Sequence, residues 1–412
     1  MSFEGFEESY RRRIRRKKLV IAIMLVLAAV AALLEIALGP YDIGFGEAYR
    51  VFFDHLTGVP IDNATDEYVV WEKNAPRGLA VFFVGAGLGI CGAAMQSALR
   101  NPLADPYMTG ISSGANFGIA LASVAGVVIL PFLTGSMGSI GNAFVLSLIP
   151  AAVIVLASGF RSSSNPTTMI LVGIAVMYVF SSFTTMLNLA ASSETFASVY
   201  MWGLGTLGSV SWDTLPYLIC ATLAGVALLS MLSARLNILS CDENLAVSSG
   251  IRPKTVRLVT IAVVSLVTAT LVCFTGTIGF VGLVAPHVMR ILIDSDNRYL
   301  LPASAACGAF VLAAADCLAV EITATGLPVG VITSIIGGPL FIYILVTQHR
   351  KVWNRGRYHE IGSRRHHVRI RRRGCSEGCD VLGGIPSVRV CPRTQRRGEV
   401  HANTLHRPHP DA

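Results

Sequence analysis

Four ionisable residues lie inside long apolar stretches of the sequence, and they are the first candidates for a chemical role. They are Glu35, His287, Arg290 and Asp316. Charged groups within a membrane-spanning segment are costly, so they face a protein interior or a polar pathway. The four residues form no chain of carboxylates across the spans, which a proton-coupled carrier often needs. The pattern favours a passive pathway that is opened from outside this chain, and Glu35 is expected to reach the membrane interface.

Two of these residues belong to a segment, 276–298, that changes from glycine-rich and apolar to polar and basic. Its centre holds Pro286 next to His287, with Arg290 one turn later. Gly279 and Gly282 are expected to give this segment a flat side, on which another helix can approach closely. An ordinary packed helix with a proline kink is the alternative interpretation.

A second motif, residues 100–114, follows Gln96 and reads Arg-Asn-Pro-Leu-Ala-Asp-Pro-Tyr-Met-Thr-Gly-Ile-Ser-Ser-Gly. The side chains of Asn101 and Asp105 can bind the local backbone, and the proline after each of them blocks a continuing helix. The motif therefore predicts a rigid turn. The residues alone leave open whether this turn also helps to build the mouth of a pathway.

The composition is that of an integral membrane protein without a recognisable catalytic set. Of the 412 residues, 53% are hydrophobic and 14% are charged, whereas soluble domains have about 25% charged residues. The sequence has neither a His-Glu-x-x-His motif nor an in-frame phosphate-binding loop. Cys375 and Cys379 are the only closely spaced cysteines, and their spacing is not that of a zinc site. We therefore expect no enzyme activity and no metal or other cofactor bound by this chain.

Apolar stretches separated by polar turns predict an all-α membrane protein with about ten spanning helices, each near the roughly 20 residues that cross a bilayer. Arginine and lysine are concentrated in alternate loops, which predicts a multi-pass protein of the cytoplasmic membrane with both termini in the cytoplasm. The expected parts are a basic N-terminus (1–18), a transmembrane domain (19–347) and a basic tail (348–412). The expected spans are 19–39, 78–98, 113–133, 142–159, 166–189, 215–233, 258–275, 280–293, 302–322 and 327–346.

A polar segment, residues 236–257, interrupts the apolar part of the chain. Residues 242–249 are expected to form one short helix. Gly250 would end this helix and Pro253 would begin the next one. The segment is the best candidate for receiving a driving force from a partner, and a solvated basic loop is the alternative.

Together these motifs resemble, in their order along the chain, the FecCD-type permeases. These are the membrane subunits of ATP-driven importers for iron-siderophore, haem and cobalamin. The likeness covers roughly residues 19–346 and includes Pro76-Arg77, 92–96, 101–106, 202–207, 279–290, Asp316 and 327–330. It implies the permease fold of this family and a homodimer of two permease copies in membrane lipid. It also implies two ATPase subunits, which bind the ATP, and an extracytoplasmic substrate-binding protein.

The resemblance also implies roles for individual residues. The segment 236–257 corresponds to two short helices that sit in a cleft of the ATPase. Its coupling residues would be Asp242, Glu243, Ala246, Gly250 and Arg252. The translocation and packing positions would be Gln96, Asn101, Pro102, Asp105, Pro106, Gly279, Gly282, Pro286, His287, Arg290, Pro328 and Gly330.

The chain departs from the family pattern at several positions. Cys241 replaces a glycine before the coupling residues. Asn74 and Val320 replace two arginines that pair with glutamates of the binding protein. Lys73 or Arg77 would then take over part of this docking. An ion- or proton-coupled secondary transporter is the alternative function.

The basic tail, 348–412, has two interpretations. It has no amphipathic period, so we expect it to be disordered, and we do not expect it to bind nucleic acid. The codons of residues 393–402, displaced by one base, can encode Gly-Pro-Asn-Gly-Ala-Gly-Lys-Ser-Thr-Leu, which is a phosphate-binding loop. A neighbouring ATPase gene read out of frame is one explanation of the tail, and a genuine tail is the other.

Overall fold

A computed structural model describes residues 3–39, 41, 43–159, 166–322, 327–343 and 346, and the tail 348–412 lies outside this part of the chain. All regular structure in the described residues is helical. The long elements are α1 (Phe3–Ala37), α4 (Ala75–Leu99), α6 (Ser136–Gly159), α7 (Pro166–Leu189), α9 (Leu215–Cys241), α11 (Pro253–Thr275) and α13 (Asn297–Ile322). The shorter ones are α2 (Phe45–Thr57), α3 (Ala64–Glu67), the π-helix η1 (Tyr68–Asn74), the 3₁₀-helix η2 (Pro106–Thr109), α5 (Ile111–Ala125), α8 (Ser193–Gly203), α10 (Glu243–Ser248), α12 (Val281–Ile293) and a last helix, Val329–Tyr343.

The predicted spans have counterparts among these helices. Within the described ranges, seven helices are long and apolar enough to cross a membrane, and three shorter apolar ones (α5, α12 and the last helix) bring the apolar helices to ten. Two boundaries differ from the prediction. The span expected at 78–98 continues a helical segment that begins at Ala64, and the span expected at 113–133 ends at Ala125. Gly126 ends α5 in the left-handed conformation, with a φ of 66°, and Asn142 then satisfies the loop backbone through Val127 and Ile129.

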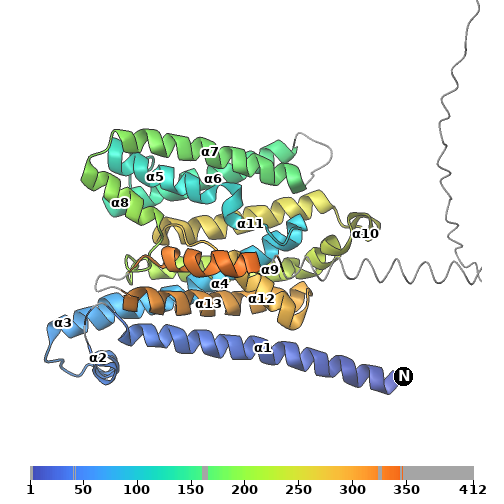
Figure 1. Ribbon diagram of the computed structural model, residues 1–412, viewed down its shortest axis with the longest axis horizontal. Helices are drawn as coiled ribbons and strands as arrows, with labels where there is room; N and C mark the ends of the chain where they lie inside the picture. Colours follow the sequence, from blue (N-terminus) through green and yellow to red (C-terminus); the bar gives the residue numbers. More distant parts are fainter. Residues whose placement is uncertain are drawn as a thin grey trace, which may run out of the picture. The chain divides into compact units, whose positions relative to one another are not determined.

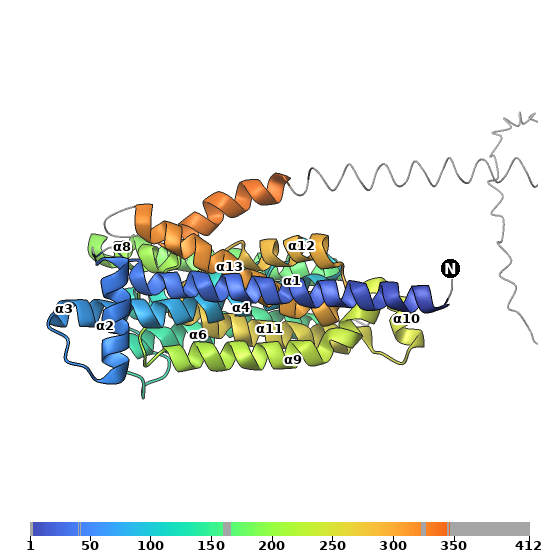
Figure 2. The same ribbon diagram turned by 90° about the horizontal axis from the view of Figure 1, so that it is seen from below.

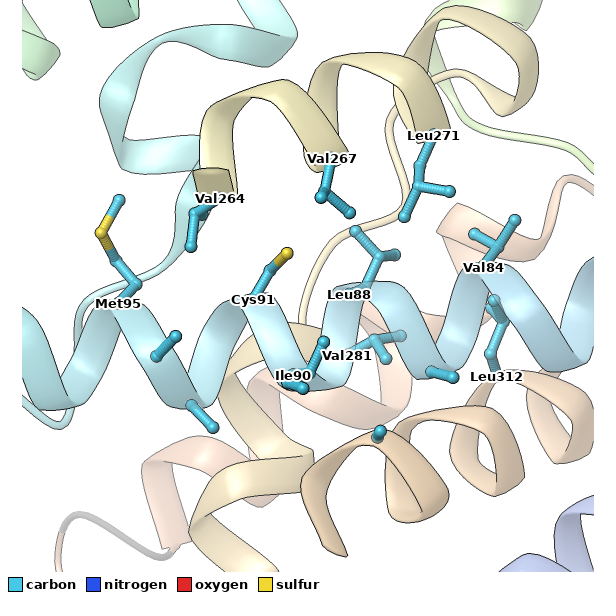
Figure 3. Close-up of a cluster of buried hydrophobic side chains, with 14 of the residues drawn as sticks. Val84, Leu88, Ile90, Cys91, Met95, Val264, Val267, Leu271, Val281 and Leu312 are labelled. Carbon is cyan, nitrogen blue, oxygen red and sulfur yellow. The ribbon is translucent and has the colours of Figure 1, made fainter. Parts of the chain in front are cut away.

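Successive spanning helices run in opposite directions, so the bundle has two ends (Figures 1 and 2). We call them the α8 end, where α2 and α3 also lie, and the α10 end, where α1 begins. The helix α4 lies at the centre and packs against α13, α9, α12, α11 and α1. The side chains of Val84, Leu88, Cys91 and Met95 follow one stripe of α4, and Figure 3 shows them pointing toward α11.

Glycines allow the closest helix contacts in the bundle. Gly85 and Gly89 of α4 lie against the backbone of Gly308 and Ser304 in α13. Gly92, one turn further, lies against Gly282 of α12. The close approach predicted at Gly282 is therefore present, and α4 and α13 approach each other in the same way through Gly85 and Gly89.

Gly279 has a different position from the one expected. It precedes α12, which begins at Val281, and a Cβ atom there would meet only the hydroxyl of Ser334, at 4.0 Å. The flat side of α12 is therefore formed at Gly282 and not at Gly279. The reason is that the chain still runs as a loop through Phe280, whose φ of 66° ends any helical path before it.

Candidate functional site

A polar pocket of about 690 Å³ opens at the α10 end, where α4, α9 and α12 finish. It unites residues from both sequence motifs with others that the sequence analysis did not select. Its lining residues are Gln96, Ser97, Arg100, Asn101, Pro102, Asn237, Ser240, Cys241, Arg290, Ser295 and Asp296. The two motifs, almost two hundred residues apart in the sequence, therefore meet in one site.

Arg290 of α12 connects the two motifs directly. Its Nη1 donates to Oε1 of Gln96 at 2.6 Å, and Gln96 itself is buried in α4. A hydrogen bond with a charged donor is stronger than one between neutral groups. The contact therefore joins α12 to α4 at the wall of the pocket. His287 and Pro286, which lie earlier in α12, are buried in the packing of this helix.

Asparagine side chains close the same end of the bundle. Asn237 of α9 donates through Nδ2 to Oδ1 of Asp296 at 2.7 Å, and its Oδ1 accepts from the backbone of Asn297 at 2.7 Å. Ser97 of α4 donates to Oδ1 of Asn297, also at 2.7 Å. These bonds tie the connection between α12 and α13 to α9 and α4. The sequence analysis missed them because isolated polar residues near helix ends carry no pattern of their own.

The turn after α4 is built as its prolines and acidic residue predicted. Asn101 accepts from the backbone N–H of Leu103 at 2.9 Å. Asp105 caps η2 by accepting from the N–H of Tyr107 at 2.8 Å, and Pro106 occupies the first turn of η2. The Tyr107 hydroxyl in turn accepts from the backbone of Ile278 at 3.3 Å. The turn is thus locally rigid and also touches the segment that leads into α12.

The predicted short helix is present as α10, between α9 and α11. Asp242 caps it by accepting from the N–H groups of Asn244 at 2.7 Å and Leu245 at 3.1 Å. Within α10, Ala246 is buried, whereas Leu245 is 50% exposed and Val247 is 61% exposed. Gly250 ends the turn with a φ of 76°. The helix therefore presents apolar side chains outward, at an end of the bundle.

Arg257 of α11, the last residue of the polar segment 236–257, is fully buried, which contradicts the alternative of a solvated loop at this position. Its Nη1 and Nη2 atoms pair with the two carboxylate oxygens of Glu243 in α10, each at 3.2 Å. Its Nε donates to the carbonyl oxygen of Ala98, in the last turn of α4, at 3.1 Å. This one side chain holds α10 against α4. A sequence signal was available, because Arg257 shares a helical face with the buried Thr260, Ile261 and Val264.

The residues considered for docking of a binding protein lie at the α8 end. Of these, Lys73 is exposed, with its Nζ 5.7 Å from the centre of the Tyr68 ring. Asn74 is buried and donates to the carbonyl of Ile36 at 3.1 Å. Arg77 turns inward and binds Asp316 through two hydrogen bonds, at 2.7 and 2.8 Å. The guanidinium of Arg77 is therefore already engaged within the chain.

Glu35 also lies at the α8 end. It is fully buried, because α4 and α13 cover the end of α1 on that side, so the prediction that it reaches the interface is wrong. Pro328 and Gly330 lie at the start of the last helix, which returns to the α10 end. Gly330 packs against the carbonyl of Leu204, and its N–H donates to the carbonyl of Gly205 at 3.2 Å. In the described residues, no cluster of three His, Cys, Asp or Glu side chains could hold a metal ion.

The helical bundle with ten apolar helices, a polar pocket and an outward-facing short helix defines a multi-pass membrane transport protein. Residues 25–347 match the FecCD transport family. The chain belongs to this family, and it is a permease of the ATP-binding-cassette (ABC) importer class.

Relatives and a solved structure agree with this assignment. The chain is 37% identical over 290 residues to the cobalamin import system permease of Halobacterium salinarum (70% of this chain, 75% of the relative). It is 30% identical to the iron(3+)-hydroxamate import permease of Bacillus subtilis (81% and 84%) and 31% identical to the hemin transport permease of Yersinia pestis (81% and 97%). A metal-chelate type ABC transporter in an inward-facing conformation superposes with a TM-score of 0.69 at 26% identity, over 80% of this chain and 99% of that one.

Proposed function

We propose that the chain forms the translocation pathway of an importer for an iron(III) chelate, haem or cobalamin. It works as a homodimer with two ATPase subunits, which bind and hydrolyse the ATP, and with an extracytoplasmic substrate-binding protein. The observation that carries the proposal is α10, whose exposed Leu245 and Val247 offer an apolar contact to a partner. The pair of Glu243 and Arg257 ties this contact to α4.

The coupling residues inferred from the sequence have distinct structural positions in this proposal. Asp242 and Gly250 shape the two ends of α10, and Ala246 seats the helix on the bundle. Glu243 points to Arg257, while Arg252 remains exposed next to the start of α11. An ATPase that binds α10 would thus move a helix that is anchored through Arg257 to the end of α4, beside the polar pocket.

The substrate class is supported by the relatives, which are named for cobalamin, iron-hydroxamate and hemin. We expect uptake of one of these three classes to require ATP when the chain is reconstituted in vesicles with its ATPase. The measurement is the accumulation of labelled siderophore, haem and cobalamin, with and without ATP on the side of the vesicle membrane where the ATPase is bound. Uptake that survives ATP depletion and fails with an uncoupler would support a secondary transporter instead.

The proposed orientation places the α10 end in the cytoplasm and the α8 end outside. We expect cysteines substituted at Asp62 and Glu194, two exposed positions at the α8 end, to react with an impermeant thiol reagent in intact cells. A cysteine at Arg252 should react only after the cells are opened. The background variant lacks the nine native cysteines, since Cys220 and Cys241 are exposed. The reverse labelling pattern would overturn the orientation.

A further inference from the structure

Three buried charged side chains from three helices meet near the α8 end. Glu35 of α1 and Asp316 of α13 are fully buried, and the side chain of Arg77 in α4 is 13% exposed. The Nε and Nη2 atoms of Arg77 bind the two carboxylate oxygens of Asp316 at 2.7 and 2.8 Å. The nearest approach of Arg77 to Glu35 is 3.9 Å, from Nε to Oε2. We call these three residues the buried triad.

Glu35 is the member of the triad that has no hydrogen bond. Among the described residues, neither of its carboxylate oxygens has a partner within hydrogen-bonding geometry. The guanidinium of Arg77 lies near two carboxylates. It binds the Asp316 carboxylate through two hydrogen bonds and makes none to Glu35. An ionised carboxylate that is buried without hydrogen bonds is very costly, and such a group becomes neutral instead.

In the described part of the chain, Arg77 is the one positive charge that acts on Glu35. From α13, Asp316 and the thiol of Cys317 face it, and that thiol is directed to the carbonyl of Ala31 at 3.9 Å. From η1, the nearby Asn74 uses its amide on the carbonyl of Ile36. From α4, Arg77 is the charged group, and Gly78 places backbone against the Glu35 side chain.

We propose that Glu35 and Asp316 share one proton, so that the buried triad is a proton-binding site that fastens α1 to α4 and α13. Two carboxylates that lie side by side do not both ionise, and one proton between them leaves a net charge of zero with Arg77. The proton sits on Glu35, because Asp316 already has both oxygens on the guanidinium. As a neutral acid, Glu35 can donate to the Asp316 carboxylate, which also removes its lack of a hydrogen bond.

This assignment makes the attachment of α1 sensitive to pH. The side chain of Arg77 is 13% exposed, and in this assignment the proton leaves along that edge, at the α8 end. Loss of the proton leaves a net negative charge among apolar helices, and the contact of α1 with α4 and α13 is weakened. A group that binds its proton more tightly in the folded state than in the unfolded state stabilises the fold at low pH. This stabilisation is lost as the pH rises.

The test compares E35Q, which is a neutral replacement of similar shape, with E321Q as a matched control. Glu321 is an exposed carboxylate on the same helix as Asp316. Infrared spectra of the purified full chain in detergent at neutral pH should show a protonated-carboxyl carbonyl band, which is absent in E35Q and retained in E321Q. Thermal stability should fall with rising pH in the parent chain and in E321Q, whereas this part of the pH dependence should be missing in E35Q.

Two results would overturn the assignment. One is a protonated-carboxyl band that is the same in E35Q and the parent chain, or that neither protein has. The other is a pH profile of stability that E35Q leaves unchanged. If E35Q were to fail to fold, the parent chain alone can still overturn the assignment: a protonated carboxyl band shifts on deuteration and a carboxylate band does not, so the absence of any band that shifts in D2O would show that Glu35 is ionised.

Discussion

Replacing Arg257 with methionine is expected to abolish ATP-driven uptake while the membrane bundle still assembles. Methionine fills a similar volume but provides neither the paired bonds to Glu243 nor the bond to the Ala98 carbonyl. An unpaired buried carbonyl costs about 1–3 kcal/mol, which is a moderate loss for a bundle of this size. The larger effect is on α10, which loses its anchor to α4. Uptake and stimulated ATP hydrolysis in reconstituted vesicles measure this loss, and thermal unfolding measures the cost in stability.

Two companion variants separate the anchor from a general effect of charge. R257K keeps the positive charge but lacks the planar fork that binds both oxygens of Glu243, so we expect it to restore little coupling. R235M removes an exposed arginine from the neighbouring helix α9 and should behave as the parent chain. Full uptake by R257M, at normal stability, would show that α10 is not held through Arg257 and would remove the structural basis of the proposed coupling.

The sequence was most informative where a feature depends on residues close together in the chain. Apolar length alone predicted the seven long apolar helices and the three shorter ones that the described residues contain. The breakers Gly250 and Pro253 predicted the ends of α10 and α11. The Asn-Pro and Asp-Pro pairs predicted the rigid turn, because Asn101 and Asp105 bond to backbone only two residues away.

The charged contacts across the bundle could not be predicted in this way. Arg77 and Asp316 are 239 residues apart, and the sequence next to each residue does not indicate which residue it will contact. Glu35 near the end of an apolar run has the pattern of an interfacial residue, and only the packing of α4 and α13 over it makes it buried. For Arg257 the helical face could be recognised in the sequence, but its bonds to Glu243 and to the Ala98 carbonyl could not. In each case the tertiary contact decides the role of a charge.

Adding one methyl group at Gly92 is expected to prevent correct folding, while the same addition at two other glycines is tolerated better. A Cβ atom on Gly92 would lie under 3.0 Å from three backbone atoms of Gly282, which cannot move aside as a flexible side chain can. Overpacking of this kind costs about 1–3 kcal/mol, and more where backbone must shift. The G92A variant should therefore give a low yield of monodisperse protein, a lower unfolding temperature and little uptake.

The two comparison variants make this expectation specific to the contact between α4 and α12. On Gly282, a Cβ atom would meet its nearest neighbours, the Leu88 carbonyl and Asp105 Oδ2, at 3.3 and 3.5 Å, so G282A should be milder than G92A. On Gly46 of α2, it would meet nothing within 4 Å, and alanine there also restricts the unfolded chain. We expect G46A to be at least as stable as the parent chain. Equal stability of G92A and G46A would mean that α4 and α12 do not approach through Gly92, and the wall that joins Gln96 to Arg290 would then have to be placed differently.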